Sequence, residues 1–274
     1  MSLTIYGLPT GSIYAPLAST ILNGGFCPTL DRREIIPWGY QESMKFSDGS
    51  TGPGVESCVP IWYIDGAEQK VLVDTSFDNC EKVMNVLKKY GGNQVFKRKE
   101  EQEIVNALKK VNVTPEQIDI VIHTHLHFDH SGNDELFKNA SFIVQKDEIP
   151  WALTPPPYGM WYYREFSFHF QNVLNRVKAI EGDVSITKGI EVWKLGGHTP
   201  GSMAVIVHTD IGRVALAGDV AVSYRNLEFR WPGGFFCNIE QVIQAYDRLL
   251  KETDVVVPGH DWEFFEKFPG GKIG

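Results

Sequence analysis

The sequence predicts a single α/β domain over residues 1–274, with sheet inside and helices outside. Segments with β-type and helix-type patterns alternate along the whole chain. No linker, low-complexity stretch or solenoid-type repeat divides them. Hydrophobic residues make up 43% of the chain and charged residues 22%, which is ordinary for a globular protein with a core.

The first half of the chain begins this alternation with a hairpin. Two β-rich runs in residues 59–76 flank an Asp65-Gly66 turn, a strong short-range hairpin signal. Apolar residues then recur at helical spacing, and β-rich runs follow. These patterns predict helical segments at 80–90, 100–111 and 114–117, and strands at 118–125 and 140–145.

The second half continues in the same way. Strands are predicted at 190–195, 202–209, 213–219 and 254–261. The clearest helix follows a capping asparagine, Asn238, and runs to residue 252. Its predicted inner stripe consists of Ile239, Val242, Ile243, Tyr246, Leu249 and Leu250.

Two stretches fit this alternation poorly. Residues 28–57 are long, polar and irregular, and residues 150–171 are dense in proline and aromatic residues. Long loops in a compact domain are often functional, so we expect both to lie near the active site or a dimer interface. The aromatic stretch fits a contact surface in a homodimer or a lid over an apolar pocket, and the sequence leaves both roles open.

Charge and cysteine content narrow the function classes. A net charge of −8 disfavours nucleic-acid binding, which needs a basic face. No apolar run approaches the roughly 20 residues of a membrane span. The four cysteines form no C-x-x-C pair, and the N-terminus lacks the pattern of a signal peptide. We therefore expect a cytoplasmic protein that acts on a small molecule, without membrane or nucleic-acid partners.

The main functional signal is HTHLHFDH at residues 123–130. Residues two apart in an extended chain point the same way, so His125 and His127 face one side and can hold one metal ion. Asp129 and His130 follow as the chain turns and point to a neighbouring position. A tetrahedral zinc ion needs three or four protein ligands. The loop thus supplies two pairs of ligands, for two metals that each need completing.

Other strand ends offer the missing ligands. His198 lies in GGHTPGS, Asp219 ends LAGD, and His260 lies in PGHD. Each lies at the carboxyl end of a predicted strand beside glycine or proline, and strand ends are rigid places for a site. The two oxygens of a carboxylate such as Asp219 can each bind one of two cations. Four motifs of this kind are hard to obtain by accident.

The order THLHFDH, GGHTPGS, AGD and PGHD resembles the metallo-β-lactamase superfamily. The helix–strand–loop unit at 100–133 and the strand VPIWYI resemble the N-acyl-homoserine lactonase-like branch. This resemblance implies an αβ/βα four-layer sandwich. It also implies two metal sites bridged by Asp219: His125, His127 and His198 in one, and Asp129, His130 and His260 in the other. Asp74 in VLVDTS supports the metal loop in this family.

The resemblance also implies the chemistry. Two divalent ions, about 3.5–4 Å apart, share a water and lower its pKa toward about 7, which provides hydroxide at neutral pH. The catalytic residues are then Asp219, as the bridge, and Asp129, which orients the hydroxide and carries its proton to the leaving oxygen. Ligands of nitrogen and oxygen make zinc the default, and iron, manganese or cobalt also fit. His123 lies earlier, in the apolar strand, and is expected in the core or beside a ligand.

The branch resemblance favours a lactone substrate, such as an N-acyl-homoserine lactone. One position departs from that branch: its tyrosine three residues after the bridging aspartate is here Val222. Tyr224 is the nearest replacement, and Phe128 matches the branch's pocket aromatic. The substrate-binding candidates are Phe128, Tyr158, Trp161, Tyr162, Phe166 and Tyr224. Hydrolysis of other esters, thioesters or organophosphates, or a non-enzymatic metal-binding role, stay open as alternatives.

Overall fold

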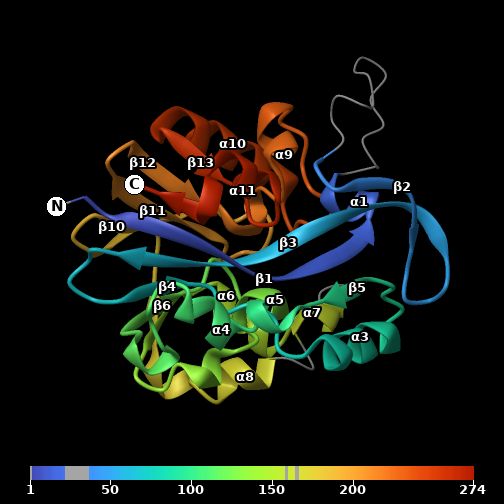
Figure 1. Ribbon diagram of the computed structural model, residues 1–274, viewed down its shortest axis with the longest axis horizontal. Coiled ribbons are helices and arrows are strands. Elements are labelled where there is room, and N and C mark those ends of the chain that lie inside the picture. The colour runs from blue at the N-terminus through green and yellow to red at the C-terminus, as the bar shows by residue number, and fades with distance from the viewer. Residues whose placement is uncertain (1, 22–36, 158–159, 164–166) are drawn as a thin grey trace.

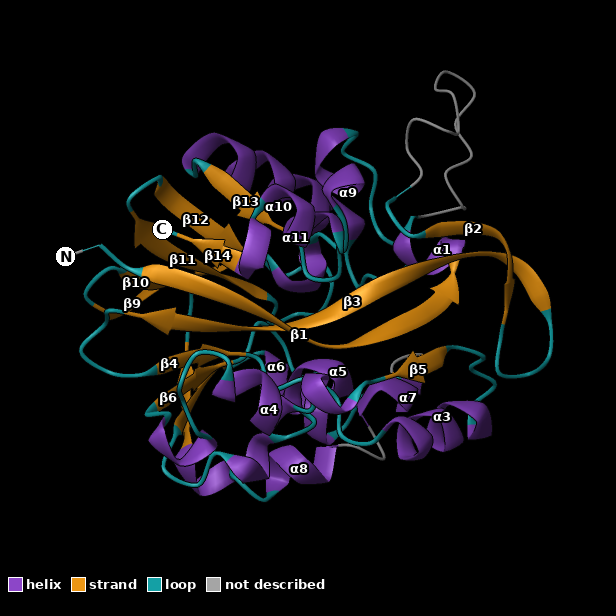
Figure 2. Cartoon of the chain, viewed as in Figure 1, coloured by secondary structure: helices purple, strands orange, loops and turns teal. Residues whose placement is uncertain are grey.

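The structure is a computed structural model of the 274-residue chain (Figure 1). It describes residues 2–21, 37–157, 160–163 and 167–274, without the side chains of residues 160–161 and 167–168. Two sheets lie against each other and helices cover their outer faces (Figure 2). This is the αβ/βα four-layer arrangement that the sequence resemblance implied.

The described strands of the first sheet follow the order β14-β1-β3-β4-β6-β7-β8, with β2 paired to β3 and β5 to β1. Their bounds are β1 Thr4–Pro16, β2 Tyr40–Lys45, β3 Thr51–Asp65, β4 Val71–Val73, β5 Val95–Lys97, β6 Ile120–Ile122, β7 Ser141–Gln145, β8 Val177–Ile180 and β14 Lys272–Ile273. The predicted hairpin is confirmed, with β3 and β4 antiparallel. Strands β4, β6, β7 and β8 run parallel, so their carboxyl ends lie at the same edge.

The second sheet has the order β13-β12-β11-β10-β9. Its strands are β9 Val184–Thr187, β10 Ile190–Lys194, β11 Met203–Thr209, β12 Gly212–Leu216 and β13 Val255–Val257. Strand β13 runs parallel to β12, with Leu216 opposite Val257. The loops that follow these two strands therefore leave the sheet side by side, and they carry Asp219 and His260.

Helices cover both outer faces, with α3 to α8 over the first sheet and α9 and α10 on the side of the second (Figure 1). The α-helices are α1 Leu17–Thr20, α3 Cys80–Lys89, α4 Ile104–Lys109, α5 Phe128–Ser131, α6 Glu148–Leu153, α7 Met160–Tyr163, α8 Ser167–Gln171, α9 Tyr224–Glu228, α10 Ile239–Glu252 and α11 Glu263–Lys267. Short 3-10 turns are η2 Glu100–Gln102, η3 Pro115–Gln117, η4 Asp134–Leu136, η6 Leu174–Arg176, η7 Gly218–Val220 and η8 Pro269–Gly271. Among the described residues, no helix has both the length and the apolar character that crossing a bilayer requires.

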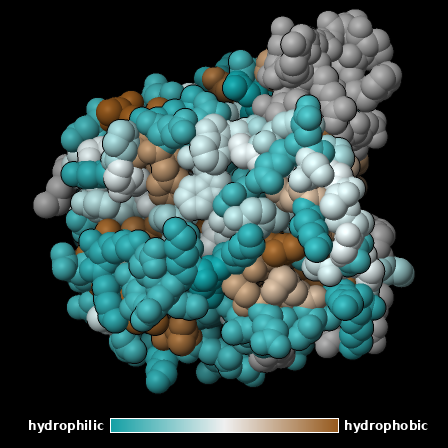
Figure 3. Space-filling view, turned by 45° about the vertical axis from the view of Figure 1, so that its right-hand side comes forward, coloured by the Kyte–Doolittle hydropathy of each residue, from teal (hydrophilic) through white to brown (hydrophobic). Residues whose placement is uncertain are grey.

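Alternation along β6 shows how the layers are held. Ile120 and Ile122 point into the core between the sheets, whereas Val121 points to the core under the helices of the first sheet. All three side chains are buried because both faces of the strand are covered. A strand in this position is therefore a continuous apolar run in the sequence. In the second sheet, Val205 faces the inter-sheet core and Ile206 faces α10. Hydrophilic residues cover most of the face in Figure 3, and hydrophobic residues reach it in small groups.

Helix α10 is confirmed, but its predicted stripe is partly wrong. The side chain of Asn238 accepts a hydrogen bond from the Gln241 backbone N–H, as a cap should. Ile239 and Leu250 are exposed, at 38% and 50%. The buried stripe is Val242, Ala245, Tyr246 and Leu249. A spacing of three and four residues keeps side chains on one face, and Leu250 lies about 100° further around the helix than its buried neighbour.

The prediction of long irregular loops at 28–57 and 150–171 is wrong for most of the described residues. Strand β2 and the first part of β3 occupy residues 40–45 and 51–57. Most side chains of β2 are exposed, so its composition resembles that of a loop. The second stretch forms short helices, α6 to α8, which pack on the first sheet; Tyr163 and Phe170 lie in its core, both 1% exposed.

Candidate metal centre

The predicted metal ligands converge at the edge where strand carboxyl ends from both sheets meet. The loop after β6 carries His125 and His127, and α5 carries Asp129 and His130. The remaining ligands come from the second sheet, in the loops after β10, β12 and β13: His198, Asp219 and His260. All seven predicted residues are brought together. They form two groups, within each of which the ligand atoms lie within 4.8 Å of one another.

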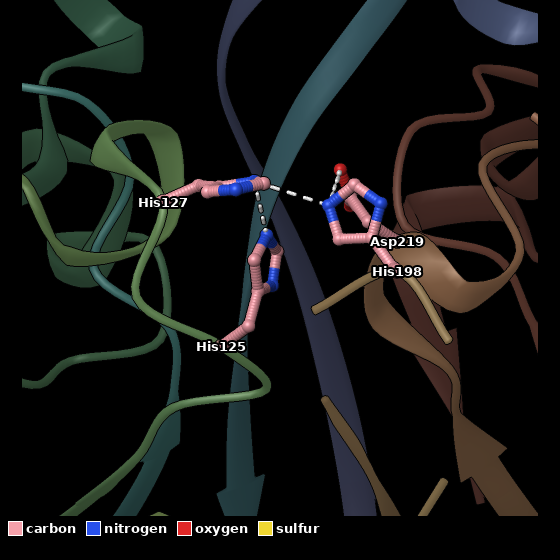
Figure 4. A group of neighbouring side chains, drawn as sticks. All are labelled: His125, His127, His198 and Asp219. Carbon is pink, nitrogen blue, oxygen red and sulfur yellow. Dashed lines mark hydrogen bonds and ion pairs between the residues drawn. The ribbon is translucent and has the colours of Figure 1, made fainter. Parts of the chain in front are cut away.

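The first group is His125, His127, His198 and Asp219 (Figure 4). His127 Nδ1 lies 2.9 Å from His125 Nε2 and 3.0 Å from His198 Nε2. His198 Nε2 lies 3.6 Å from Asp219 Oδ2. These side chains come from both sheets, so the group exists only when the two sheets are packed together.

The second group is Asp129, His130 and His260. His130 Nε2 lies 3.2 Å from His260 Nε2. The other oxygen of Asp219, Oδ1, lies 3.2 Å from His130 Nε2 and 2.9 Å from His260 Nε2. Asp219 therefore presents one oxygen to each group, which is the arrangement that a carboxylate bridging two cations requires.

The hydrogen bonds of the far ring nitrogens show that this donor set fits metal ions. His130 Nδ1 lies 2.7 Å from Asp74 Oδ2, His198 Nδ1 lies 2.9 Å from the Phe235 carbonyl, and His260 Nδ1 lies 2.7 Å from the Cys58 carbonyl. Each Nδ1 faces an acceptor and therefore carries the proton. Nε2 is thus the ring nitrogen that points to the centre, and it is the atom that would bind a metal ion once it carries no proton.

The histidines of the two ligand groups differ in the direction in which their pKa is shifted. Burial, together with neighbouring histidines, holds the pKa of His125 and His127 well below the ordinary value, so both are neutral. Burial also acts against a charged His130, but Asp219, Asp74 and Asp129 outweigh it and raise its pKa well above the ordinary value. The second group thus holds protons that metal ions have to displace.

A buried network lies behind the second group. Asp74 follows β4 with φ +60° and accepts hydrogen bonds from the Thr124 backbone N–H and hydroxyl, both at 2.8 Å. His123 is buried, as predicted, with Nε2 3.0 Å from Asp134 Oδ1 and Nδ1 3.6 Å from Asp74 Oδ1. Burial lowers the pKa of His123, but the two carboxylates raise it to about 9. His123 therefore lies beside the ligands and is not one of them.

A cavity opens beside the ligands, with a largely apolar wall. Phe128 and Tyr162 line it, as predicted. The Tyr162 ring stacks on His127, with ring centroids 4.4 Å apart, and meets Phe235 edge-on at 5.2 Å. Sequence reasoning missed much of the wall because it comes from β1, α3, β5 and the connection between α3 and β5, which carry no motif: Ile13, Ala15, Leu87, Gln94 and Phe96.

The prediction that Tyr224 binds substrate is wrong. Tyr224 begins α9 and packs against the inter-sheet core, with the Lys267 ammonium 4.7 Å from its ring centroid. Ser223 caps this helix and turns the chain away from the cavity, where Val222 remains as the lining residue. Of the other candidates, Tyr158 and Phe166 and the side chain of Trp161 lie outside the described residues.

Sequence reasoning also missed Glu148, the first residue of α6. It is fully buried and accepts hydrogen bonds from both loops that carry the three histidines of the first group. A lone glutamate three residues after a buried strand is the only sequence signal for it, and that signal is weak.

Comparison with known proteins assigns the family. The profile of the metallo-beta-lactamase superfamily matches residues 57–260, which include every ligand of the centre. The chain belongs to this superfamily of metal-dependent hydrolases.

Within it, the chain belongs to the branch of N-acyl homoserine lactonases. It is 33% identical over 248 residues to an N-acyl homoserine lactonase of Bacillus sp, covering 86% of this chain and 95% of that protein. A lactonase of the same name from Bacillus cereus is 31% identical over 246 residues, with the same coverage. A crystal structure described as a quorum-quenching N-acyl homoserine lactone hydrolase superposes with a TM-score of 0.71 at 25% identity, over 97% of this chain and 96% of that chain.

Proposed function

We propose that this protein is a dinuclear-metal lactonase that opens the ring of an N-acyl homoserine lactone or a similar cyclic ester. One observation carries the proposal: Asp219 presents one oxygen to each of two ligand groups at the side of an apolar cavity. The relatives named above are lactonases, and this supports a lactone as the substrate. A cavity walled by Phe128, Tyr162 and Phe235 suits an acyl chain.

The donor set favours zinc as the metal in both sites. Neutral imidazoles and carboxylates in groups of three and four match the ligand number of catalytic zinc. His125, His127 and His198 would hold one ion, Asp129, His130 and His260 the other, and Asp219 both. When bound, two such ions activate a shared water near neutral pH and polarise the substrate carbonyl.

The protein's own contribution to ring opening centres on Asp129. Its Oδ2 lies 3.6 Å from His260 Nε2, at the side of the cavity. Burial raises the pKa of Asp129, with His130 and His260 opposing, so this carboxylate accepts a proton more readily than an exposed aspartate. It takes the proton of the attacking water and delivers it to the ring oxygen as the carbon–oxygen bond breaks. The product is a hydroxy acid, whose new carboxyl group ionises and releases one proton to the solvent.

The aromatic residues of the cavity wall bind the substrate and exclude water from it. Tyr162 covers His127, and Phe128 packs behind it with ring centroids 6.4 Å apart. A dry wall of this kind strengthens electrostatic interactions at the reacting carbon. A cytoplasmic location also belongs to the proposal, because Cys58, Cys80 and Cys237 are free thiols, as in proteins of reducing compartments.

Acid release from a panel of substrates tests the proposal. The panel contains N-acyl homoserine lactones of several chain lengths, other lactones, aryl esters, thioesters and phosphotriesters. We expect turnover of lactones that is lost in Asp129→Asn and in protein treated with a chelator. Turnover of aryl esters or phosphotriesters but not lactones would overturn the substrate assignment. Turnover that survives metal removal would overturn the mechanism.

A further inference from the structure

Glu148 lies at the start of α6, just after β7, next to the loops that carry the three histidines of the first group. Its side chain is fully buried, at 0% exposure. No lysine, arginine or histidine of the described chain forms an ion pair with it. A buried carboxylate without a cation is stable only where hydrogen-bond donors replace its water, so its surroundings reveal what it holds.

Two of these donors belong to the loops that carry the first group. The backbone N–H of Leu126, between His125 and His127, donates to Oε1 at 3.0 Å. The Thr199 hydroxyl, next to His198, donates to Oε2 at 2.6 Å. The carboxylate thus joins the segment after β6 in the first sheet to the segment after β10 in the second.

Close packing at Gly201 strengthens this link. The Gly201 backbone N–H donates to Oε2 of Glu148 at 3.1 Å. A Cβ atom on Gly201 would lie 2.4 Å from Glu148 Cβ and 2.6 Å from its backbone nitrogen, which no side chain allows. The His198 loop can approach α6 only because this residue is glycine.

A third segment reaches the same carboxylate. The hydroxyl of Tyr163 in α7 donates to Glu148 Oε1 at 2.8 Å. The preceding residue, Tyr162, stacks on His127. Glu148 thereby contacts residues next to every imidazole of the first group. Glu148 itself is not among the residues that line the cavity.

We propose that Glu148 is a positioning residue for the first metal site: it sets the distance of His198 from His125 and His127. Each oxygen of the Glu148 carboxylate accepts a backbone N–H, from Leu126 or from Gly201. In a glutamine, the amide NH2 would take the place of one oxygen and would face one of these N–H groups, donor against donor. The proposal rests on the metal centre proposed above. A group that orients ligands in this way typically changes metal affinity by about 10–100-fold when it is removed.

Zinc titration of metal-free protein against a chromophoric chelator tests the proposal without any measurement of activity. In Glu148→Gln we expect one of the two zinc affinities to fall by about 10–100-fold and the other to stay near the wild-type value. Adding His198→Ala to Glu148→Gln should weaken that site by less than His198→Ala does in the wild type. Thr199→Val, which removes one donor and keeps the shape, should change the same affinity in the same direction and provides the test if Glu148→Gln does not fold.

Leu249→Ala is the matched control, because Leu249 is fully buried in α10, in a core cluster that contains none of the residues that donate to Glu148. It should lower the melting temperature and leave both zinc affinities unchanged. Unchanged or equally reduced affinities at both sites in Glu148→Gln and Thr199→Val would overturn the positioning role. Binding of a single zinc ion by the wild type would instead overturn the two-metal centre, and the positioning proposal with it.

Discussion

Asp74→Asn changes the hydrogen bonds of one carboxylate oxygen behind the second ligand group, because Oδ2 accepts from the Thr124 hydroxyl and faces His130 Nδ1. Asp74 has φ +60°, a backbone conformation that asparagine adopts as readily as aspartate, so the exchange leaves the chain path unchanged. The amide oxygen can still accept the Thr124 N–H, which lies 2.8 Å from Oδ1. The amide nitrogen then takes the place of Oδ2 and faces His130 Nδ1, at 2.7 Å in the native protein.

This replacement reverses the polarity of the contact with the ligand. Because the amide nitrogen donates, His130 Nδ1 has to accept, and the ring proton moves to Nε2. Nε2 is the atom that faces Asp219 Oδ1 at 3.2 Å and would bind the metal. A hydrogen bond to a charged group contributes about 1.5–3 kcal/mol, and about 1.4 kcal/mol corresponds to a tenfold change in affinity. We therefore expect zinc binding at the second site to weaken by about 10–100-fold.

The assay is a stepwise zinc titration of metal-free Asp74→Asn against a chromophoric chelator. Asp183→Asn is the control, because Asp183 is an exposed carboxylate that pairs with Arg248 away from the centre. Only one of the two steps should weaken in Asp74→Asn, and neither should change in the control. Two wild-type affinities in Asp74→Asn would refute the argument that Asp74 fixes the ring proton of His130.

Four further outcomes follow from the structure. Tyr224→Phe should leave kcat/KM for a lactone unchanged because this side chain lies outside the cavity. Tyr162→Ala should raise KM because Tyr162 lines the cavity. Acid-release kinetics measure both effects. Leu249→Ala should lower the free energy of unfolding by about 2–5 kcal/mol in urea titrations, since Leu249 is fully buried. Despite burial, the carboxylates of Asp219 and Asp129 raise the pKa of His130 and His260 above 6.5. Zinc affinity should therefore rise with pH above that value, because zinc has to displace these protons. Calorimetry in two buffers should detect the protons that are released on zinc binding.

The ligand set could be predicted from the sequence because each ligand follows a strand end. Asp219 and His260 leave parallel neighbours, β12 and β13, so the two residues had to emerge side by side. His125 and His127 occur in one short motif. Both the four-layer fold and the pairing of the ligands came from resemblance, and the structure agrees with both.

The cavity wall could not be predicted in the same way. It is assembled from chain segments that are distant in sequence, such as Ile13 in β1 and Leu87 in α3, and neither has a local pattern that reveals the contact. The prediction for Tyr224 was wrong because a capped helix starts at this residue. A single serine, Ser223, is a weak sequence signal for such a helix start. Glu148 is a single residue whose partners are mostly backbone N–H groups and hydroxyls, which leave no signature in a sequence.

The distribution of ligands over both sheets also bears on how the protein is made. A ribosome releases the chain from its N-terminus, so the four ligands at 125–130 emerge long before His260, which is 130 residues beyond His130. Until then, a metal ion meets an open loop with too few ligands to hold it firmly. Tight capture therefore has to wait until the second sheet has been synthesised and has packed on the first.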